Sequence, residues 1–352
     1  MDAEVNLVLP LFLLSVMTAN VVVIGAGVVG LSTAINIQRL VPSCSVTIVA
    51  EDVVDGTTSV GAGAIFRPTE EYLPGVDIQR ARQWIRDGWE HFSSLALSEH
   101  SGPAGIAITP SFMLSRAEIK DPLYKDVVFT FHELSRDEMK KMGFDKHFSY
   151  GYLVTTIVIT TKLYLVWLLK RFLQNGGKVE KRRVSNMNEF LGRYRIVVNC
   201  SAIGSRQLFG DKLIHPNRGQ LLRVKAPWIK YCIYTDADAY IIPNQGLVAV
   251  GGSREENNYD ISIDDKESKA ILERCCKICP SLKRAEVDHV WAGLRPVRSP
   301  LRIEKEIIKV ENDQLTVVHN YGHCSDGIAL SWGTAVEAAG MVRDCLKCSS
   351  KL

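Results

Sequence analysis

The stretch Val21-Val-Val-Ile-Gly25-Ala-Gly27-Val-Val-Gly30-Leu-Ser-Thr-Ala-Ile35 decides the fold. An apolar run leads into three glycines spaced G-x-G-x-x-G, and a helix-like segment follows them. We expect Gly25 to permit a tight turn off a strand and Gly27 to let backbone N–H groups approach a pyrophosphate. Gly30 would let the helix pack close to the strand. The pattern predicts a dinucleotide site, and a glycine-rich turn in an ordinary α/β unit is the alternative.

A second predicted strand supports the nucleotide interpretation. The segment 45–50 reads as a strand, and it ends at Glu51. An acidic residue about 20 positions beyond such glycines is the expected acceptor for a ribose hydroxyl. Residues 20–60 are therefore predicted to form a βαβ unit, with Glu51 at the nucleotide.

Composition excludes several other classes of protein. The chain has 352 residues, 46% of them hydrophobic, and a formal net charge of +3, which disfavours a nucleic-acid footprint. Nine cysteines form an odd number in a long chain, so we expect reduced thiols rather than a disulfide framework. The pairs Cys276/Cys279 and Cys345/Cys348 lie too far apart for a zinc ribbon, and no metal site is expected.

The two ends of the chain carry different targeting signals. The apolar run 6–19 has the length of a signal-peptide core, but Asp2 and Glu4 precede it instead of basic residues. The run is too short to span a bilayer. The final residues Ser350, Lys351 and Leu352 form a peroxisomal address. We expect import into the peroxisome by its receptor, with secretion, or a start at Met17, as the alternatives left open.

The hydrophobic pattern beyond residue 60 predicts two kinds of structure. Helical spacing occurs over 77–97, 164–173, 266–278 and 333–346, and the buried strand 195–200 runs into a second glycine turn. Apolar and polar residues alternate over 219–252, which predicts an antiparallel sheet. We therefore expect an α/β fold in which a discontinuous nucleotide-binding domain (20–66, 160–215 and 290–350) accompanies an antiparallel substrate domain (67–159 and 216–289), after an apolar extension (1–19).

Motifs spread over most of the chain carry a resemblance to known proteins. They include the segments 21–33, 57–59, 197–201, 218–220, 240–243, 251–254, 293–298 and 319–323. Together these segments resemble the D-amino-acid oxidase family, and its aspartate-specific branch most, from residue 20 to near the C-terminus and in the order of the family. The resemblance implies FAD as the cofactor, bound by a Rossmann-like domain, with an antiparallel-sheet domain over the substrate.

The resemblance also implies which residues contact FAD. The glycine turn holds the pyrophosphate, the acidic residue after the second strand holds the ribose, and later segments face the adenine and the flavin. In this chain these residues are Gly25, Gly27, Val28, Val29, Gly30, Glu51, Thr57, Thr58, Ser59, Val184, Gly322, Gly327, Ile328 and Ala329.

At the substrate, the resemblance assigns the α-carboxylate to Arg295 and Tyr240, and it places Ser325 near the amine. A guanidinium fork suits a carboxylate, whose two oxygens it can bind at once. Arg254 and Arg218 match basic residues of the aspartate-specific branch. A desolvated arginine without an anionic partner is costly, so their presence favours an acidic substrate.

The function implied is oxidation of an acidic D-amino acid (D-aspartate or D-glutamate) by dioxygen, giving the 2-oxo acid, ammonia and hydrogen peroxide. A broad oxidase of neutral D-amino acids and a catalytically silent flavoprotein are the alternatives. The chain departs from the family at Cys324 and Asp326, which stand where glycine is common. We expect these two residues to tighten the flavin loop and to affect turnover more than fold.

Overall fold

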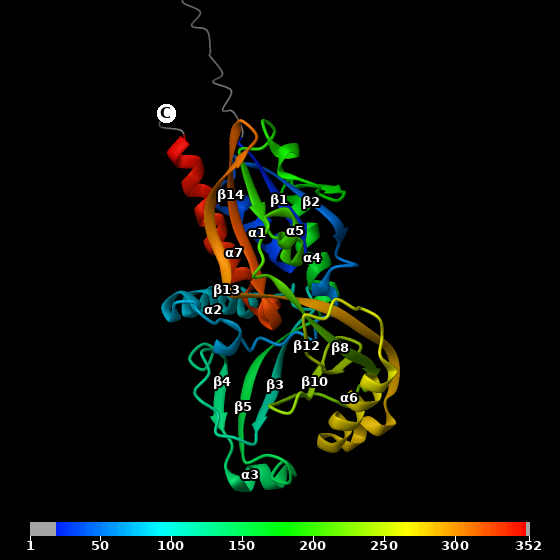
Figure 1. Cartoon of the computed structure of the whole chain (residues 1–352). Helices are drawn as coiled ribbons and strands as arrows, with labels where there is room; N and C mark the ends of the chain where they lie inside the picture. Colours follow the sequence, from blue (N-terminus) through cyan, green and yellow to red (C-terminus); the bar gives the residue numbers. More distant parts are fainter. Residues whose placement is uncertain (1–18, 350–352) are drawn as a thin grey trace, which may run out of the picture.

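The computed structural model describes residues 19–349. The expected extension over 1–19 and the C-terminal address therefore lie almost wholly outside the described residues. Figure 1 shows a parallel-stranded upper part, a more open lower part made largely of antiparallel strands, and one long strand that runs between them.

The upper part is a parallel sheet that begins with the quoted stretch. Its strand order is β14-β7-β1-β2-β6, and all four neighbouring pairs are parallel. The residues of β7 are all buried, as expected for a continuous apolar run between two other strands. The strands are β1 (Asn20–Ala26), β2 (Ser45–Val53), β6 (Lys178–Lys181), β7 (Ile196–Asn199) and β14 (Asp313–His323).

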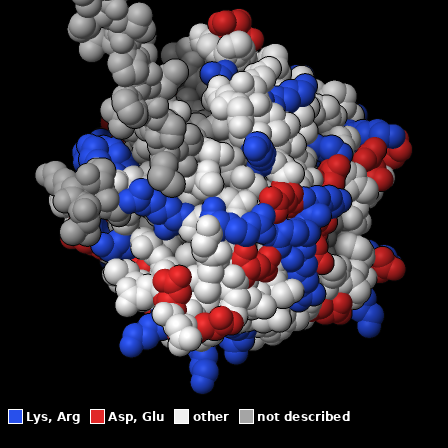
Figure 2. Space-filling view, turned by 90° about the horizontal axis from the view of Figure 1, so that it is seen from above, with Lys and Arg blue, Asp and Glu red and all other residues white. Residues whose placement is uncertain are grey.

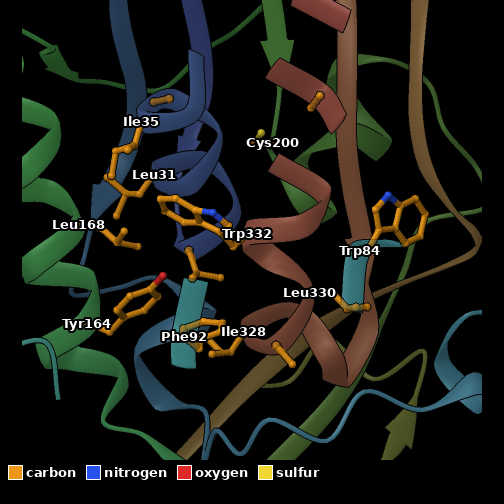
Figure 3. Close-up of a cluster of buried hydrophobic side chains, with 14 of the residues drawn as sticks. Leu31, Ile35, Trp84, Phe92, Tyr164, Leu168, Cys200, Ile328, Leu330 and Trp332 are labelled. Atoms are coloured by element: carbon orange, nitrogen blue, oxygen red, sulfur yellow. The ribbon is translucent and has the colours of Figure 1, made fainter. Parts of the chain in front are cut away.

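Four helices pack together beside this sheet. They are α1 (Val28–Leu40), α2 (Ile78–Ala96), α4 (Thr161–Gln174) and α7 (Gly327–Ser349). Leu31 of α1, Trp84 and Phe92 of α2, and Tyr164 of α4 are almost wholly buried. Figure 3 shows Leu31, Phe92 and Tyr164 on the same side of α7 as its Trp332, and Trp84 on the other side of that helix. Burying a large apolar side chain contributes about 2 kcal/mol, so this cluster fixes the helices around the sheet.

The lower part is mostly antiparallel, as the alternation over 219–252 predicts. Only the pairing of β3 with β9 is parallel there, which the sequence pattern does not show. The strands are β3 (Ile106–Ser115), β4 (Thr130–Glu133), β5 (Tyr150–Ile159), β8 (His215–Lys225), β9 (Cys232–Thr235), β10 (Tyr240–Pro243), β11 (Val248–Gly251) and β12 (Glu255–Glu256), and the helices are α3 (Arg136–Lys141) and α6 (Asp265–Ile278).

Strand β13 (Glu286–Val310) joins the two parts into one 14-stranded sheet. Its first half pairs with β8 and its second half with β14, both antiparallel. The predicted domain boundaries stay a prediction, although α2, which falls within the segment 67–159, packs against α7 of the upper part.

The helix predicted over 333–346 begins six residues earlier, at Gly327. A short helix, α5 (Ser205–Leu208), also follows the second glycine turn after β7. The earlier start of α7 matters for the site, because Gly327, Ile328 and Ala329 form a first helical turn rather than a loop.

The charge pattern of one face, the helices and the metal-ligating side chains bear on other kinds of partner. On the face in Figure 2, basic and acidic side chains are interspersed. No helix among the described residues is long and apolar enough to cross a bilayer. Within 19–349, no cluster of histidine, cysteine, aspartate and glutamate could hold a metal ion.

Candidate active site

A cavity of about 940 Å³ lies where the two parts of the sheet meet. This volume lies near the upper end of the range for pockets that bind a cofactor or a substrate. Its walls come from the β1–α1 turn, the end of β2, the segment 56–67, strand β10, the start of β13 and the passage from β14 into α7. Every predicted site residue except Arg218 lines this cavity. The residues are thus brought together, while the role of each stays a prediction.

The glycine turn has the geometry that the spacing predicts. Gly25 has φ +106°, a conformation that favours glycine, and a Cβ there would lie 2.5 Å from the carbonyl oxygen of Cys200. A Cβ at Gly30 would collide with the carbonyl oxygen of Gly25. Both positions must therefore be glycine for α1 to start this close to β1 and β7.

The start of α1 presents free donors to the cavity. The first turn of a helix has N–H groups without intrahelical acceptors, and these attract anions. The side chain of Ser59 accepts a hydrogen bond from the Val28 N–H at 3.1 Å, while the N–H groups of Val29 and Gly30 donate to no described residue. Glu51 lies exposed at the end of β2 on the same cavity, and Thr57, Thr58 and Val184 also line it.

The passage from β14 into α7 forms the wall toward the predicted flavin end. Gly322 has φ +95°, and a Cβ there would lie 2.7 Å from the Cβ of Arg298. Gly327, Ile328 and Ala329 line the cavity from the first turn of α7, so the expected late loop is a helix N-terminus. Ser325 lines the cavity just before it.

Arg295 and Tyr240 occupy spaces that glycines leave for them. A Cβ at Gly219 would collide with the Arg295 guanidinium, and a Cβ at Gly251 would collide with the Tyr240 ring. Arg295 donates from Nη1 to Asn217 Oδ1 at 3.2 Å and to two backbone carbonyls. Its Nη2 and the Tyr240 hydroxyl donate to no described residue, so both are available to a ligand.

Arg254 lies at the mouth of the cavity and already has acidic neighbours. Its guanidinium is 3.5 Å from Asp238 and 3.7 Å from Glu71, and its Nη2 donates to the Tyr234 hydroxyl at 3.3 Å. About a third of its side chain (34%) is exposed. A substrate carboxylate would compete with two carboxylates of the protein at this position.

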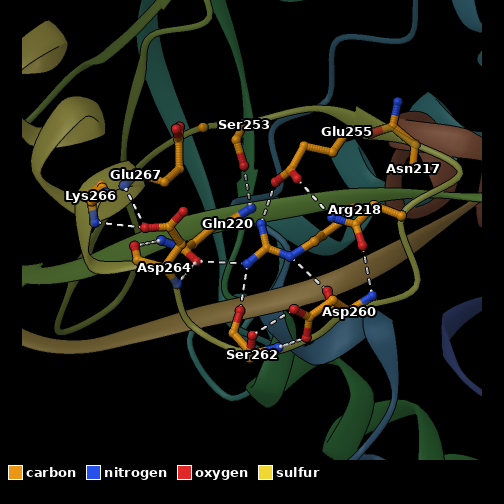
Figure 4. A network of polar contacts seen from close by, with 12 residues as sticks. Asn217, Arg218, Gln220, Ser253, Glu255, Asp260, Ser262, Asp264, Lys266 and Glu267 are labelled. Carbon is orange, nitrogen blue, oxygen red and sulfur yellow. Dashed lines mark hydrogen bonds and ion pairs between the residues drawn. The ribbon is translucent and has the colours of Figure 1, made fainter.

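Arg218 does not line the cavity, so the structure does not bring it together with the other predicted site residues. Its side chain is buried, and Figure 4 shows its guanidinium directed into the segment 255–264. It donates to the carbonyl of Asp260 at 2.7 Å and to Gln220 Oε1 at 3.0 Å, and it pairs with Glu255. The sequence does not show that this segment folds back over β8. Arg218 thus holds a loop, while its own carbonyl supports Arg295.

Sequence reasoning missed three other cavity residues. Arg67 and Tyr234 line the cavity, and the guanidinium carbon of Arg67 lies 3.9 Å from the centre of the Tyr234 ring. Asp326, noted only as a departure from glycine, is buried in the same wall. An acidic residue in a buried turn is the signal that could have pointed to a nearby cation.

The residues present fit FAD. The glycine turn leaves space where a Cβ would collide, the start of α1 offers donors for a pyrophosphate, and Glu51 stands at the position of a ribose acceptor. A βαβ nucleotide unit joined to a largely antiparallel sheet, with one cavity between them, defines a nucleotide-dependent oxidoreductase.

Comparison with known proteins gives the family. The chain belongs to the FAD dependent oxidoreductase family, whose model matches residues 20–341. It is 39% identical to a D-aspartate oxidase of Homo sapiens, over 94% of this chain and 96% of that one. It is 34% identical to a D-amino acid oxidase of Dugesia ryukyuensis, over 93% and 98% of the two chains. The flavin cofactor and the fold class predicted from the sequence are thereby confirmed.

A solved structure shares the fold. Glycine oxidase from Geobacillus kaustophilus superposes with a TM-score of 0.76, covering 93% of this chain and 95% of that one. The sequence identity is 17%, so this likeness concerns the fold alone.

Proposed function

We propose that this protein catalyses the FAD-dependent oxidative deamination of D-amino acids, and of acidic ones in particular. The relatives named D-aspartate oxidase and D-amino acid oxidase support the reaction, and the basic side chains of the cavity favour an acidic substrate. The observation that carries the proposal is the pair formed by Arg295 and Tyr240, whose free donors lie on a cavity that fits FAD.

The two residues are suited to hold an α-carboxylate. Arg295 supplies a fixed charge with Nη2 unused, and the side chain is oriented by Asn217 and two carbonyls. Burial raises the pKa of Tyr240, so its hydroxyl stays protonated and donates. Gripping the carboxylate in this way would fix the orientation of the Cα–H bond, and positioning of that kind supplies much of the catalysis in such reactions.

Among the described residues, the histidine of the cavity wall is not suited to act as a general base. His323 lines the cavity, but burial lowers its pKa to about 3, and its Nε2 contacts Thr334 Oγ1 at 3.0 Å. We therefore expect the substrate to react with its amine neutral, the proton having passed to solvent. When bound, FAD would supply the two-electron acceptor for the Cα hydride, and dioxygen would take up the two electrons as hydrogen peroxide. Water then converts the released imino acid to the 2-oxo acid and ammonia.

A substrate panel tests the proposal. Peroxide release from the purified holoenzyme is measured with D-aspartate, D-glutamate, D-alanine and the L-enantiomers. We expect the acidic D-amino acids to give the highest kcat/KM. A preference for D-alanine would indicate a broad oxidase, and a yellow protein that releases no peroxide with any D-amino acid would indicate a silent flavoprotein.

A further inference from the structure

Arg67 differs from the other arginines that line the cavity. No hydrogen bond or ion pair joins its guanidinium to a described residue, although Arg67 lines the cavity. Arg182 pairs with Glu180 and Glu189, and Arg183 donates to Gln207. Arg254 lies beside two carboxylates, and Arg295 is anchored by Asn217 and carbonyls.

The position of Arg67 is nevertheless well defined. Its guanidinium lies over the Tyr234 ring at 3.9 Å, within the range of a cation–π interaction. Tyr234 in turn stacks on Tyr240, with ring centres 5.8 Å apart and planes 9° apart. A chain of contacts therefore leads from Arg67 to the residue proposed to hold the α-carboxylate.

Asp326 sits near Arg67 without neutralising it directly. Its Oδ2 accepts a hydrogen bond from the Thr69 N–H at 2.8 Å, which ties it to the backbone two residues beyond Arg67. No contact within 4.0 Å joins the two charged groups, yet each affects the pKa of the other. Asp326 thus orients the segment that carries Arg67 and leaves the guanidinium donors free.

Leaving such a group unpaired is unfavourable. Arg67 is half-buried in the cavity wall. A guanidinium that loses part of its water needs hydrogen-bond acceptors, and a carboxylate satisfies it better than any neutral group. In the sequence, the cost of an unpaired guanidinium favoured Arg254 as the residue that binds an acidic group. That side chain is more exposed, however, and has Glu71 and Asp238 beside it. In the structure, Arg67 is the arginine without such a partner.

We infer that Arg67, stacked on Tyr234 and oriented through Asp326, is the principal receptor for the side-chain carboxylate of the substrate. This inference rests on the proposed function. Arg254 then acts at the mouth of the cavity, where it helps to attract an acidic substrate, and Arg295 with Tyr240 holds the other end of the molecule.

The test compares two substrates that differ only at the side-chain carboxylate. D-2-Aminobutyrate has a methyl group where D-aspartate has its side-chain carboxylate. We expect Arg67→Met to lower kcat/KM for D-aspartate by about 10- to 100-fold, the range for hydrogen bonds to a charged group, and to change that for D-2-aminobutyrate little. Arg254→Met, the matched control, should cost D-aspartate less.

A binding measurement gives a readout independent of turnover. Succinate and butyrate, which lack the amine, are titrated into each holoenzyme while the flavin absorbance is followed. Arg67→Met should weaken succinate binding and leave butyrate binding unchanged. If that variant does not retain flavin, Arg67→Gln, which keeps polarity without charge, takes its place.

The outcomes separate this inference from the proposed function. Equal losses for both substrates in Arg67→Met, or an acidic preference abolished by Arg254→Met and kept by Arg67→Met, would overturn the inference alone. A wild-type holoenzyme that oxidises no D-amino acid would overturn the proposed function, and one that prefers D-2-aminobutyrate would overturn both the acidic specificity and the inference.

Discussion

The Arg67 guanidinium carbon lies 3.9 Å from the centre of the Tyr234 ring, on the wall of the cavity where the two parts of the sheet meet. Neither residue belongs to the glycine turn or to the predicted substrate set. Their contact places a cation without an acidic hydrogen-bond partner beside the tyrosine that stacks on Tyr240. The predictions below follow from this arrangement and from the anchoring of the residues around it.

Binding of a dicarboxylate should depend on the ionisation of Asp326. Burial raises the pKa of Asp326 to about 7, against the opposing influence of Arg67 and the Thr69 N–H. Below pH 7 Asp326 is mainly protonated and Arg67 is fully available. Above pH 7 the negative charge of Asp326 opposes the positive field of Arg67 and repels a dicarboxylate, so succinate should bind more weakly as Asp326 ionises.

Asp326→Asn should remove this pH dependence. The surrounding charged and titratable groups (Glu71, Tyr72, Tyr124, Tyr234 and Arg254) are retained in the variant, and isothermal titration with succinate gives the affinity at each pH. An equal decline of affinity with pH in wild type and variant would assign the effect to another group.

Arg295→Met should reduce kcat/KM for every D-amino acid by more than about 100-fold, because two charge-assisted hydrogen bonds to the α-carboxylate are lost. Tyr240→Phe removes one hydroxyl and should cost about 10-fold. Initial rates with D-aspartate and D-2-aminobutyrate measure both effects. A loss confined to D-aspartate would mean that these residues bind the side-chain carboxylate instead.

Arg218→Met should affect stability rather than specificity. Arg218 is buried and holds Asp260, Gln220 and Glu255, so its loss leaves buried acceptors unpaired. We expect the free energy of unfolding to fall by about 3 kcal/mol, measured by chemical denaturation. The ratio of kcat/KM for D-aspartate and D-2-aminobutyrate should stay as in wild type. A changed ratio with unchanged stability would restore Arg218 to the substrate site.

Gly30→Ala should abolish flavin retention, because the added Cβ would collide with the carbonyl of Gly25 and push α1 away from β1. The ratio of flavin to protein absorbance after purification measures the effect. Gly340→Ala is the matched control within α7: nothing lies within 4 Å of its Cβ, and alanine favours a helix by about 1 kcal/mol. Equal flavin content in both variants would contradict the packing argument.

Much of the fold and cofactor site could be predicted from the sequence, because local constraints determine them. The spacing of Gly25, Gly27 and Gly30 reflects a turn and a close helix approach that hardly vary with the rest of the chain. The alternation over 219–252 likewise follows from strands with one face buried. Glu51 lies near the end of β2, so its position follows from the position of that strand.

The substrate end was less predictable because it depends on long-range packing. Arg218 and Arg254 both looked available, yet the segment 255–264 folds back onto Arg218, and Glu71 comes from a distant part of the chain to Arg254. Arg67 belongs to no motif that marks it. Hydrogen bonds that join its chain neighbours Phe66 and Thr69 to distant parts of the chain bring it into the cavity wall.

The most direct test of the central claim is anaerobic mixing of the wild-type holoenzyme with D-aspartate, L-aspartate and D-2-aminobutyrate, each over a range of concentrations, while the flavin absorbance is recorded. The account predicts that D-aspartate bleaches the flavin at the lowest concentration, D-2-aminobutyrate only at much higher concentration, and L-aspartate not at all. Flavin that D-aspartate leaves oxidised, or that D-2-aminobutyrate reduces more readily, would contradict it.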